Sequence, residues 1–343
     1  MPSIEELRIL QALPLSLKVR RSQQRIREWI DRFGTDGVSI SFSGGKDSTV
    51  LLHLVRELYP DIPAVFVNTG LEYPEIQRFV REFENVEILY PKMPFPEVIS
   101  KYGYPFITKE VSQTVYEARA GHKGSAMYQK LLGTLKAPDG TLSRWNIPKY
   151  KALVDTDFWI SNRCCNVMKK GPIKTYEKAT GRHSFTAMMA VESKRRENQW
   201  VLHGCNAFDS NRPTSNPMAF WVENDVLEFV KAEGIKIAPV YGDIVVQGDD
   251  GFVYDSMIGD GCKYRTTGCD RTGCIFCGFG AHLEKGEGRF ERLKRTHPKQ
   301  YDYCMGGGAY GEDGIWRPSK YGLGMAHVID ELCRLYGPGF IKY

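Results

Sequence analysis

The chain has 343 residues, of which 42% are hydrophobic and 25% charged, and its formal net charge is +5. This composition is typical of a globular protein with one large core and a smaller appendage. It contains no run near the roughly 18 consecutive apolar residues of a membrane span, and its first ten residues lack a signal-peptide layout. We therefore expect a cytoplasmic protein without a membrane partner. The modest charge permits a polyanionic partner but does not require one.

The first predicted element is an amphipathic helix over residues 16–33, where apolar side chains recur among basic ones. We expect residues 1–37 to form a helical cap. Residues 38–42 then alternate between apolar and small polar side chains, as a strand does, and residues 50–58 are apolar at helical spacing. The sequence SGGKDS joins this strand to this helix.

The loop between strand and helix combines flexibility, charge and hydroxyl groups. Gly44 and Gly45 let backbone amides approach an anion, and the helix start adds its positive dipole end. Lys46 supplies a mobile charge, and Ser43 and Ser48 supply hydroxyl donors. The spacing fits neither a Walker loop nor GxGxxG. We interpret it as a different phosphate-binding loop, with an ordinary strand-to-helix turn as the alternative.

The loop resembles the SGGxDS loop of the PP-loop adenine nucleotide hydrolases, which cleave ATP between the α- and β-phosphates or bind adenylyl sulfate. The resemblance implies an adenine nucleotide as ligand, ATP or adenylyl sulfate, with its pyrophosphate or sulfate oxygens held by the loop. It further implies that Lys46 and Asp47 are the catalytic residues and that Asp47 helps to place Mg²⁺.

The elements that follow alternate between strand and helix: a strand over residues 64–68, a helix to about residue 83, and a strand over residues 86–90. This alternation predicts an α/β fold with a doubly wound parallel sheet, and we assign the nucleotide-binding domain to residues 38–242. Ligands of such sheets gather at the carboxyl ends of strands. By resemblance to the family's DTG segment, four residues line the adenosine site: Asn68, Thr69, Gly70 and Glu72.

We interpret residues 101–157 as an inserted lid and residues 243–343 as a cysteine-rich region. The chain has nine cysteines, which favour metal or redox chemistry in a cytosolic protein because thiols there stay reduced.

Two cysteine segments resemble those of the adenylyl sulfate reductases: residues 162–173, NRCCNVMKKGPI, with Met168 in place of an arginine, and residues 272–278, TGCIFCG. The resemblance implies a [4Fe-4S] cluster ligated by Cys164, Cys165, Cys274 and Cys277. Two alternatives stay open, namely inert buried thiols and a zinc knot made by Cys262, Cys269, Cys274 and Cys277.

Two more segments lengthen the match. Residues 186–196 resemble the reductases' substrate segment, with Arg196 aligned and Met189 where the family has its first arginine. In NPMAFWVENDV, the family pattern implies structural roles for Trp221 and Asp225, the latter as a helix cap or as a partner of the helix dipole. In all, the resemblance to the phosphoadenosine phosphosulfate reductase family covers about residues 38–280.

The departures from the reductases decide our leading hypothesis. The resemblance implies that sulfate reductases usually lose the loop lysine and carry a carboxy-terminal ECGLH segment, whereas this chain keeps Lys46 and lacks that segment. Cys304 is the remaining candidate for an attacking thiol, with a plain surface thiol as the alternative. We therefore expect an ATP-dependent adenylating enzyme that transfers sulfur from a cysteine desulfurase to a nucleic acid, DNA or tRNA.

The first alternative is a thioredoxin-dependent reductase that makes sulfite, and the second is a nucleotide sensor with a structural metal. The basic residues that could contact nucleic-acid phosphates, or simply form a solvated face, are Lys194, Arg195, Arg196, Arg289, Arg292, Lys294, Arg295 and Lys299.

Overall fold

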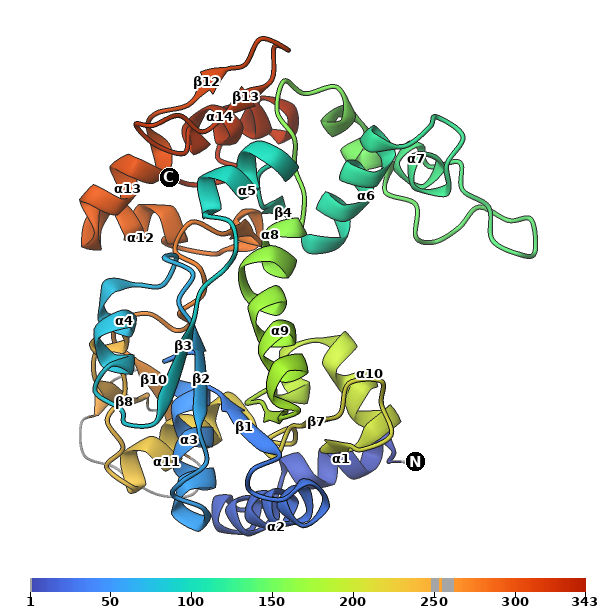
Figure 1. Ribbon diagram of the computed structural model, residues 1–343. Helices are drawn as coiled ribbons and strands as arrows, with labels where there is room; N and C mark the ends of the chain where they lie inside the picture. Colours follow the sequence, from blue (N-terminus) through green and yellow to red (C-terminus); the bar gives the residue numbers. More distant parts are fainter. Residues whose placement is uncertain (1, 248–252, 255–261) are drawn as a thin grey trace. The chain divides into compact units, whose positions relative to one another are not determined.

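The computed structural model describes residues 2–247, 253–254 and 262–343, and the chain divides into two compact units (Figure 1). Unit 1 comprises Met1–Asn68, Glu72–Tyr90 and Pro172–Gly273, and unit 2 comprises Thr69–Leu71, Pro91–Gly171 and Cys274–Tyr343. The boundary we predicted after residue 242 falls inside unit 1, and the predicted insertion falls inside unit 2. Part of the predicted cysteine-rich region, residues 248–252 and 255–261, lies outside the described residues.

Unit 1 is built on a six-stranded sheet with the order β3-β2-β1-β5-β7-β6. All its pairings are parallel except that of β6 with β7. The strand order runs outward from β1 in both directions, so β1 is the point at which a doubly wound sheet reverses. The α/β prediction is thus confirmed. The strands are β1 (Val38–Ser41), β2 (Ala64–Val67), β3 (Val86–Leu89), β5 (His183–Phe185), β6 (Asn206–Ala207) and β7 (Thr214–Ser215).

The sheet strands are short and apolar, and their side chains form the core with the helices of the unit. Val38 and Ile40 are fully buried, as is Phe185 on β5. The helices are α1 (Ile4–Gln11), α2 (Leu15–Phe33), α3 (Lys46–Leu58), α4 (Pro74–Val80), α9 (Gly171–Thr180), α10 (Lys194–His203) and α11 (Glu223–Ala232), with short 3₁₀ turns η3 (Ala190–Glu192) and η4 (Pro239–Tyr241).

Helix α2 confirms the predicted amphipathic helix, and it packs against α3. Its buried stripe includes a lysine: Lys18 Nζ donates to both carboxylate oxygens of Asp225, at 2.8 and 2.7 Å. Asp225 also accepts from Val222 N at 2.7 Å, which confirms its predicted role as a helix cap. Trp221 is fully buried and donates to Ser22 Oγ. The start of α11 is therefore fixed to α2.

A second, antiparallel sheet of unit 1 has the order β10-β8-β9. It consists of β8 (Ile244–Gln247), β9 (Val253–Tyr254) and β10 (Lys263–Thr266). Tyr264 on β10 packs with Val246 and Leu227 in a small apolar cluster, which joins this sheet to α11.

Unit 2 is mainly helical, with two short strand pairs, β4 with β11 and β12 with β13. Its helices are α5 (Phe95–Tyr102), α6 (Lys109–Ala120), α7 (Ala126–Leu132), α8 (Arg163–Cys165), α12 (Arg289–Thr296), α13 (Pro298–Met305) and α14 (Met325–Tyr336), with turns η1 (Pro148–Val154), η2 (Asn166–Lys170) and η5 (Ala281–Leu283). Its strands are β4 (Phe106–Ile107), β11 (Gly278–Phe279), β12 (Ala309–Tyr310) and β13 (Trp316–Arg317).

Candidate active site

The SGGKDS loop lies at the carboxyl end of β1, where the strand order of the sheet reverses. Gly44 has φ +71°, and a Cβ atom there would lie 2.7 Å from a Val80 methyl group and 2.8 Å from an Ile76 methyl group. Both facts require glycine at this position. Ser48 Oγ accepts from Ser43 N at 3.1 Å and donates to Gly45 O at 2.9 Å. The loop is thus a tight turn whose end is the first turn of α3.

Lys46 is the first residue of α3, and its side chain is only 3% exposed. Its ammonium group donates to Asp270 O at 2.8 Å and lies 3.0 Å from Glu223 Oε1. Burial lowers the pKa of Lys46, but the carboxylates of Asp47 and Glu223 outweigh burial and leave that pKa above its ordinary value. Lys46 is therefore a charged ammonium beside the loop amides.

Asp47 lies beside Lys46 and has an incompletely satisfied carboxylate. Its Oδ1 atom is buried and makes no hydrogen bond to any described residue, and it lies 3.8 Å from Lys46 Nζ. Burial raises the pKa of Asp47, Lys46 opposes that rise, and Glu192 and Glu223 add to it. A buried carboxylate oxygen without a hydrogen bond fits a ligand for a hard divalent cation. Asp47 thus fits the predicted magnesium ligand.

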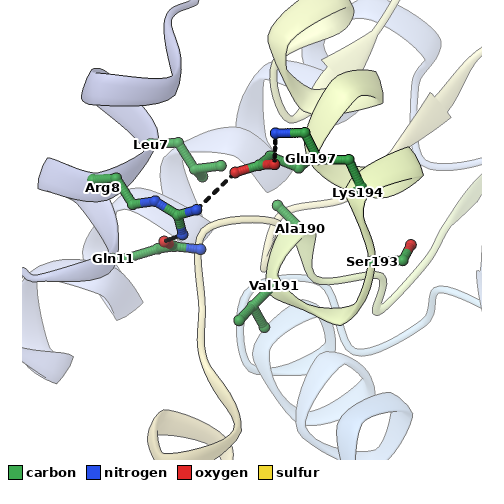
Figure 2. A pocket seen from close by; sticks show the side chains of 8 residues that line it. All are labelled: Leu7, Arg8, Gln11, Ala190, Val191, Ser193, Lys194 and Glu197. Atoms are coloured by element: carbon green, nitrogen blue, oxygen red, sulfur yellow. Dashed lines mark hydrogen bonds and ion pairs between the residues drawn. The ribbon is translucent and has the colours of Figure 1, made fainter.

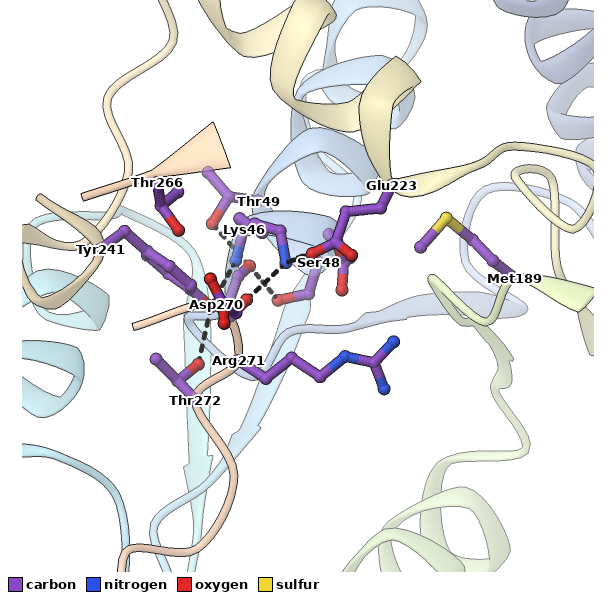
Figure 3. Close-up of polar contacts among 12 residues, drawn as sticks. Lys46, Ser48, Thr49, Met189, Glu223, Tyr241, Thr266, Asp270, Arg271 and Thr272 are labelled. Carbon is purple, nitrogen blue, oxygen red and sulfur yellow. Dashed lines mark hydrogen bonds and ion pairs between the residues drawn. The ribbon is translucent and has the colours of Figure 1, made fainter. Parts of the chain in front are cut away.

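Three contacts around the loop come from distant parts of the sequence (Figure 3). Tyr241 Oη accepts from Lys46 N at 3.0 Å, and it lies 2.7 Å from Thr272 Oγ1. Glu223, at the start of α11, faces Lys46. Sequence reasoning missed Tyr241 because no local motif marks it, and it interpreted the TGCIFCG segment, which begins with Thr272, for its cysteines alone. Glu223 lies within the NPMAFWVENDV segment, but that pattern points to the structural Trp221 and Asp225.

The predicted substrate segment is held by ion pairs of its own. Arg196 pairs with Glu192, and Arg271 lies 3.9 Å from the other oxygen of the same carboxylate. Met189 is buried, and its backbone N–H donates to Glu192. Glu192 therefore gathers two arginines in unit 1, one predicted and one that the sequence analysis missed. The nucleotide-contacting role of Arg196 stays a prediction.

The segment after β2 begins with Asn68, which belongs to unit 1. The next residues, Thr69–Leu71, belong to unit 2. Gly70 has φ +73°, and Thr69 Oγ1 accepts from Leu71 N at 3.1 Å. Thr69 and Glu72 are buried. The assignment of Asn68, Thr69, Gly70 and Glu72 to an adenosine site stays a prediction.

In unit 2, four cysteines line one small pocket. Cys164 and Cys165 end α8, and Cys274 and Cys277 precede β11. The other lining residues are Leu71, Phe95, Pro105, Met168 and Lys169. The sequence resemblance predicted this set of four.

The surroundings of the pocket shift the pKa values of the two adjacent thiols, Cys164 and Cys165, in opposite directions. A hydrogen bond from Cys164 lowers the pKa of Cys165 to about 6, helped by Lys109, Lys169 and Lys170 against the effect of burial. The same hydrogen bond, together with burial, raises the pKa of Cys164. Burial also raises the pKa of Cys277. Cys165 therefore has the most thiolate character of these three.

The thiol geometry tests the predicted metal centre. No group of three or more histidine, cysteine, aspartate or glutamate side chains in the described ranges lies close enough to hold a single metal ion. No disulfide joins any of the nine cysteines, all of which are described. Four thiols around one apolar pocket fit the donor set of an iron–sulfur cluster, which is larger than one ion. The cluster, with zinc as its alternative, stays a prediction.

The other cysteines lie elsewhere in the two units. Cys262 and Cys269 belong to unit 1, and Cys262 packs against the Leu227 cluster. In unit 2, Cys304 is fully buried with its Sγ 3.4 Å from Met325 Sδ, and burial raises its pKa. A buried neutral thiol is a poor nucleophile, which counts against Cys304 as an attacking group.

The basic residues of α12 are largely paired. Arg289 pairs with Glu284 and donates to Cys277 O at 2.8 Å, whereas Arg292 and Arg295 both pair with Glu287. Lys294 lies over the Tyr301 ring. Lys194, in unit 1, pairs with Glu197. These pairs reduce the positive charge available to a nucleic acid.

A separate cavity of about 170 Å³ lies between α1 and α10 of unit 1 (Figure 2). Three of its polar side chains pair around one carboxylate: Arg8 donates to Glu197 and to Gln11 Oε1, each at 2.8 Å, and Lys194 pairs with the same Glu197. Gln11 Nε2 is buried and makes no hydrogen bond to any described residue. No residue of the SGGKDS loop lines it. We do not assign the cavity to the active site.

The fold is an α/β fold with a doubly wound sheet, and the SGGKDS loop lies at the reversal point of that sheet. The chain belongs to the phosphoadenosine phosphosulfate reductase domain family, whose sequence model matches residues 37–90 and 97–277. The resemblance predicted from the sequence is thereby confirmed. Within the described residues, no helix is long and apolar enough to span a membrane.

Curated relatives share the family name over short stretches. A "Phosphoadenosine 5'-phosphosulfate reductase" of Xylella fastidiosa (strain 9a5c) is 35% identical over 79 residues, which are 23% of this chain and 33% of the relative. One of Xanthomonas axonopodis pv. citri (strain 306) is 39% identical over 70 residues, 20% of this chain and 29% of the relative. The chain thus matches about a third of the length of these relatives.

Solved structures that resemble this chain include the phosphoadenylyl-sulfate reductase from Candida auris in a phosphate complex. It aligns with a TM-score of 0.38 and 15% identity, and covers 76% of this chain and 97% of that chain.

Proposed function

We propose that the protein is an adenylating enzyme that binds ATP and Mg²⁺ at the SGGKDS loop and releases pyrophosphate. The observation that carries the proposal is the pairing of Lys46 and Asp47. A charged, buried ammonium lies 3.8 Å from a carboxylate oxygen that is buried without a hydrogen bond. A diphosphate leaving group with its metal needs both a cation and a metal ligand, whereas a sulfate ester needs less charge compensation.

The proposed reaction is attack by an acceptor oxygen on the α-phosphorus of ATP. A new P–O bond forms, the bond between that phosphorus and the α,β-bridging oxygen breaks, and its electron pair leaves on pyrophosphate. Lys46 and the amides of the first turn of α3 neutralise the leaving group, and Asp47 holds the metal. Sulfur at the sulfide level, supplied through a cysteine desulfurase and a thiol reductant, then displaces AMP from the acceptor.

The four cysteines of unit 2 would hold the [4Fe-4S] cluster, whose chemistry would be electron or sulfur delivery. Cys164, Cys165, Cys274 and Cys277 line one pocket, and the low pKa of Cys165 favours ligation by its thiolate. The acceptor is proposed to be a nucleic acid, although the ion pairs on α12 leave less free positive charge there than the sequence suggested.

Reduction of adenylyl sulfate or its 3′-phosphorylated form is the second candidate, because the curated relatives carry the name of that reductase. Two thiol electrons from thioredoxin would convert the sulfate group to sulfite, releasing the adenosine phosphate and a disulfide. This reaction needs an attacking thiol, and Cys304 is poorly placed for that role because it is fully buried.

The test uses anaerobically purified protein in two reactions. The first contains Mg²⁺, ATP and a candidate acceptor, DNA or tRNA, with pyrophosphate as the readout. The second contains adenylyl sulfate and thioredoxin, with sulfite as the readout. Pyrophosphate that disappears in Lys46→Met supports adenylation. Sulfite without pyrophosphate would replace our proposal by the reductase, and tight ATP binding without either product would indicate a nucleotide sensor.

A further inference from the structure

Two donors of Lys46 that would hold a phosphate, its backbone amide and its ammonium group, already have protein oxygens as acceptors (Figure 3). Tyr241 Oη accepts from Lys46 N at 3.0 Å, and Asp270 O accepts from Lys46 Nζ at 2.8 Å. A Cβ atom on Gly45 would lie 3.2 Å from Tyr241 Oη and 3.3 Å from Thr272 Oγ1. Two hydroxyl oxygens therefore lie directly against the loop backbone, at the amino end of α3.

These hydroxyls form a connected pair. Tyr241 Oη lies 2.7 Å from Thr272 Oγ1, so the tyrosine can accept from the Lys46 amide while donating its own proton to the threonine. The Tyr241 side chain is 2% exposed, and its ring lies 5.6 Å from Lys46 Nζ. Burial raises the pKa of Tyr241, which keeps the hydroxyl neutral.

We infer that Tyr241 and Thr272 form a latch that competes with the nucleotide phosphate for the Lys46 amide. An anion that uses all the amides at this helix start must first displace the tyrosine hydroxyl, because one N–H group cannot hold both at full strength. The latch lowers the affinity for every diphosphate ligand, because the hydrogen bond from Lys46 N to Tyr241 Oη must break before the phosphate can bind that amide. This inference rests on the proposed phosphate role of the loop.

The variant that tests the latch is Tyr241→Phe, which keeps the ring and its packing and removes the acceptor. The net free energy of one ordinary hydrogen bond corresponds to a change in the dissociation constant of roughly two- to tenfold. We expect Tyr241→Phe to bind inorganic pyrophosphate with Mg²⁺ that much more tightly than the wild type in calorimetry. Thr272→Val, which removes the partner hydroxyl, should shift binding in the same direction.

A double variant separates a latch from a general structural effect. If both hydroxyls act through one bond to Lys46 N, then Tyr241→Phe combined with Thr272→Val binds no more tightly than Tyr241→Phe alone. Additive changes would contradict the latch. The matched control is Tyr176→Phe, which removes a buried tyrosine hydroxyl that bonds to Glu87 at 2.9 Å in the same unit. It should leave pyrophosphate binding unchanged.

The possible outcomes test the latch separately from the proposed binding of ATP at the SGGKDS loop. Weaker or unchanged binding by Tyr241→Phe, with normal binding by the wild type, overturns the latch and leaves the proposed function standing. Failure of the wild type and of all variants to bind pyrophosphate or ATP overturns both. Binding that appears only in Tyr241→Phe supports a latch strong enough to hold the loop closed to ligands.

Discussion

Lys46 and Glu223 form an ion pair between the first residues of two helices, α3 and α11, with 3.0 Å between Nζ and Oε1. The Lys46 side chain is 3% exposed and that of Glu223 is 48% exposed. The lysine is therefore shielded from solvent, whereas the glutamate can turn to solvent when a phosphate replaces it. Lys46 is thus held at the loop by a replaceable partner.

Removing the Lys46 charge should abolish most activity. We expect Lys46→Met to reduce pyrophosphate release on the order of 10²- to 10³-fold, as when one electrostatic stabiliser of a transition state is lost. Single-turnover kinetics would measure it. The matched control is Lys236→Met, whose exposed ammonium pairs with Glu82. Equal losses in the two variants would contradict a specific role for Lys46.

Neutralising Asp47 should stabilise the protein while removing its metal dependence. Burial raises the pKa of Asp47, so its ionised form is disfavoured in the folded state. The associated destabilisation is present above the folded pKa and disappears as pH falls below the unfolded pKa. We expect Asp47→Asn to raise Tm at neutral pH, with the gain shrinking in acid, and to abolish the Mg²⁺ dependence of nucleotide binding. A lower Tm at neutral pH would contradict this account.

Gly44 should tolerate no side chain. Its φ of +71° alone costs an alanine about 1–2 kcal/mol. The new Cβ would also press on Val80 and Ile76, so we expect Gly44→Ala to cost more than the strain alone and to weaken ATP binding. Gly234→Ala is the control, since it has φ +63° and open space around it. Chemical denaturation would measure the loss of unfolding free energy in both variants. If Gly44→Ala and Gly234→Ala lose the same amount, the contact of the new Cβ with Val80 and Ile76 does not contribute.

The buried pair of Lys18 and Asp225 should matter for stability. Lys18→Met leaves the Asp225 carboxyl in the core without its cationic partner, and breaking such a pair typically costs about 3–5 kcal/mol. Urea denaturation would measure the free energy of unfolding. Arg25→Ala, which removes a half-exposed pair with Glu28 on the same helix, should cost at most about 1 kcal/mol. A cost for Lys18→Met no larger than that of the control would show that the pair contributes little.

The metal assignment predicts a split among the cysteine variants. Serine at any of the four pocket positions should lower bound iron and acid-labile sulfide, because each thiolate is a ligand. Cys262→Ser and Cys269→Ser should retain both. Metal analysis of anaerobically purified variants decides the matter. Stoichiometric zinc that is lost in Cys262→Ser and Cys269→Ser would instead favour the zinc knot that these two cysteines make with Cys274 and Cys277.

The sequence predicted the parts of this protein that depend on neighbouring residues. Strand β1, the SGGKDS loop and α3 follow from local periodicity, glycine chemistry and a helix start within one continuous stretch. The capping role of Asp225 likewise depends on residues close in sequence. Alternation of strands with helices was enough to predict the sheet.

The contacts that complete the site could not be predicted in the same way. Tyr241 lies 195 residues from Lys46, and Lys18 lies 207 residues from Asp225. These contacts depend on how the whole of unit 1 packs. The residues next to a tyrosine or a lysine in the sequence do not indicate a partner so far along the chain. The pairing of Arg289, Arg292 and Arg295 with glutamates is another case, because a count of basic residues does not show which charges are already neutralised.

The most direct test of the central claim is a crystal structure of the protein with Mg²⁺ and a non-hydrolysable ATP analogue. Our account predicts density for the β- and γ-phosphates at the amides of Gly45 to Ser48, with Lys46 Nζ turned from Asp270 O to a phosphate oxygen and a metal at Asp47. Nucleotide bound at another place, with the loop still closed by Tyr241, would contradict it.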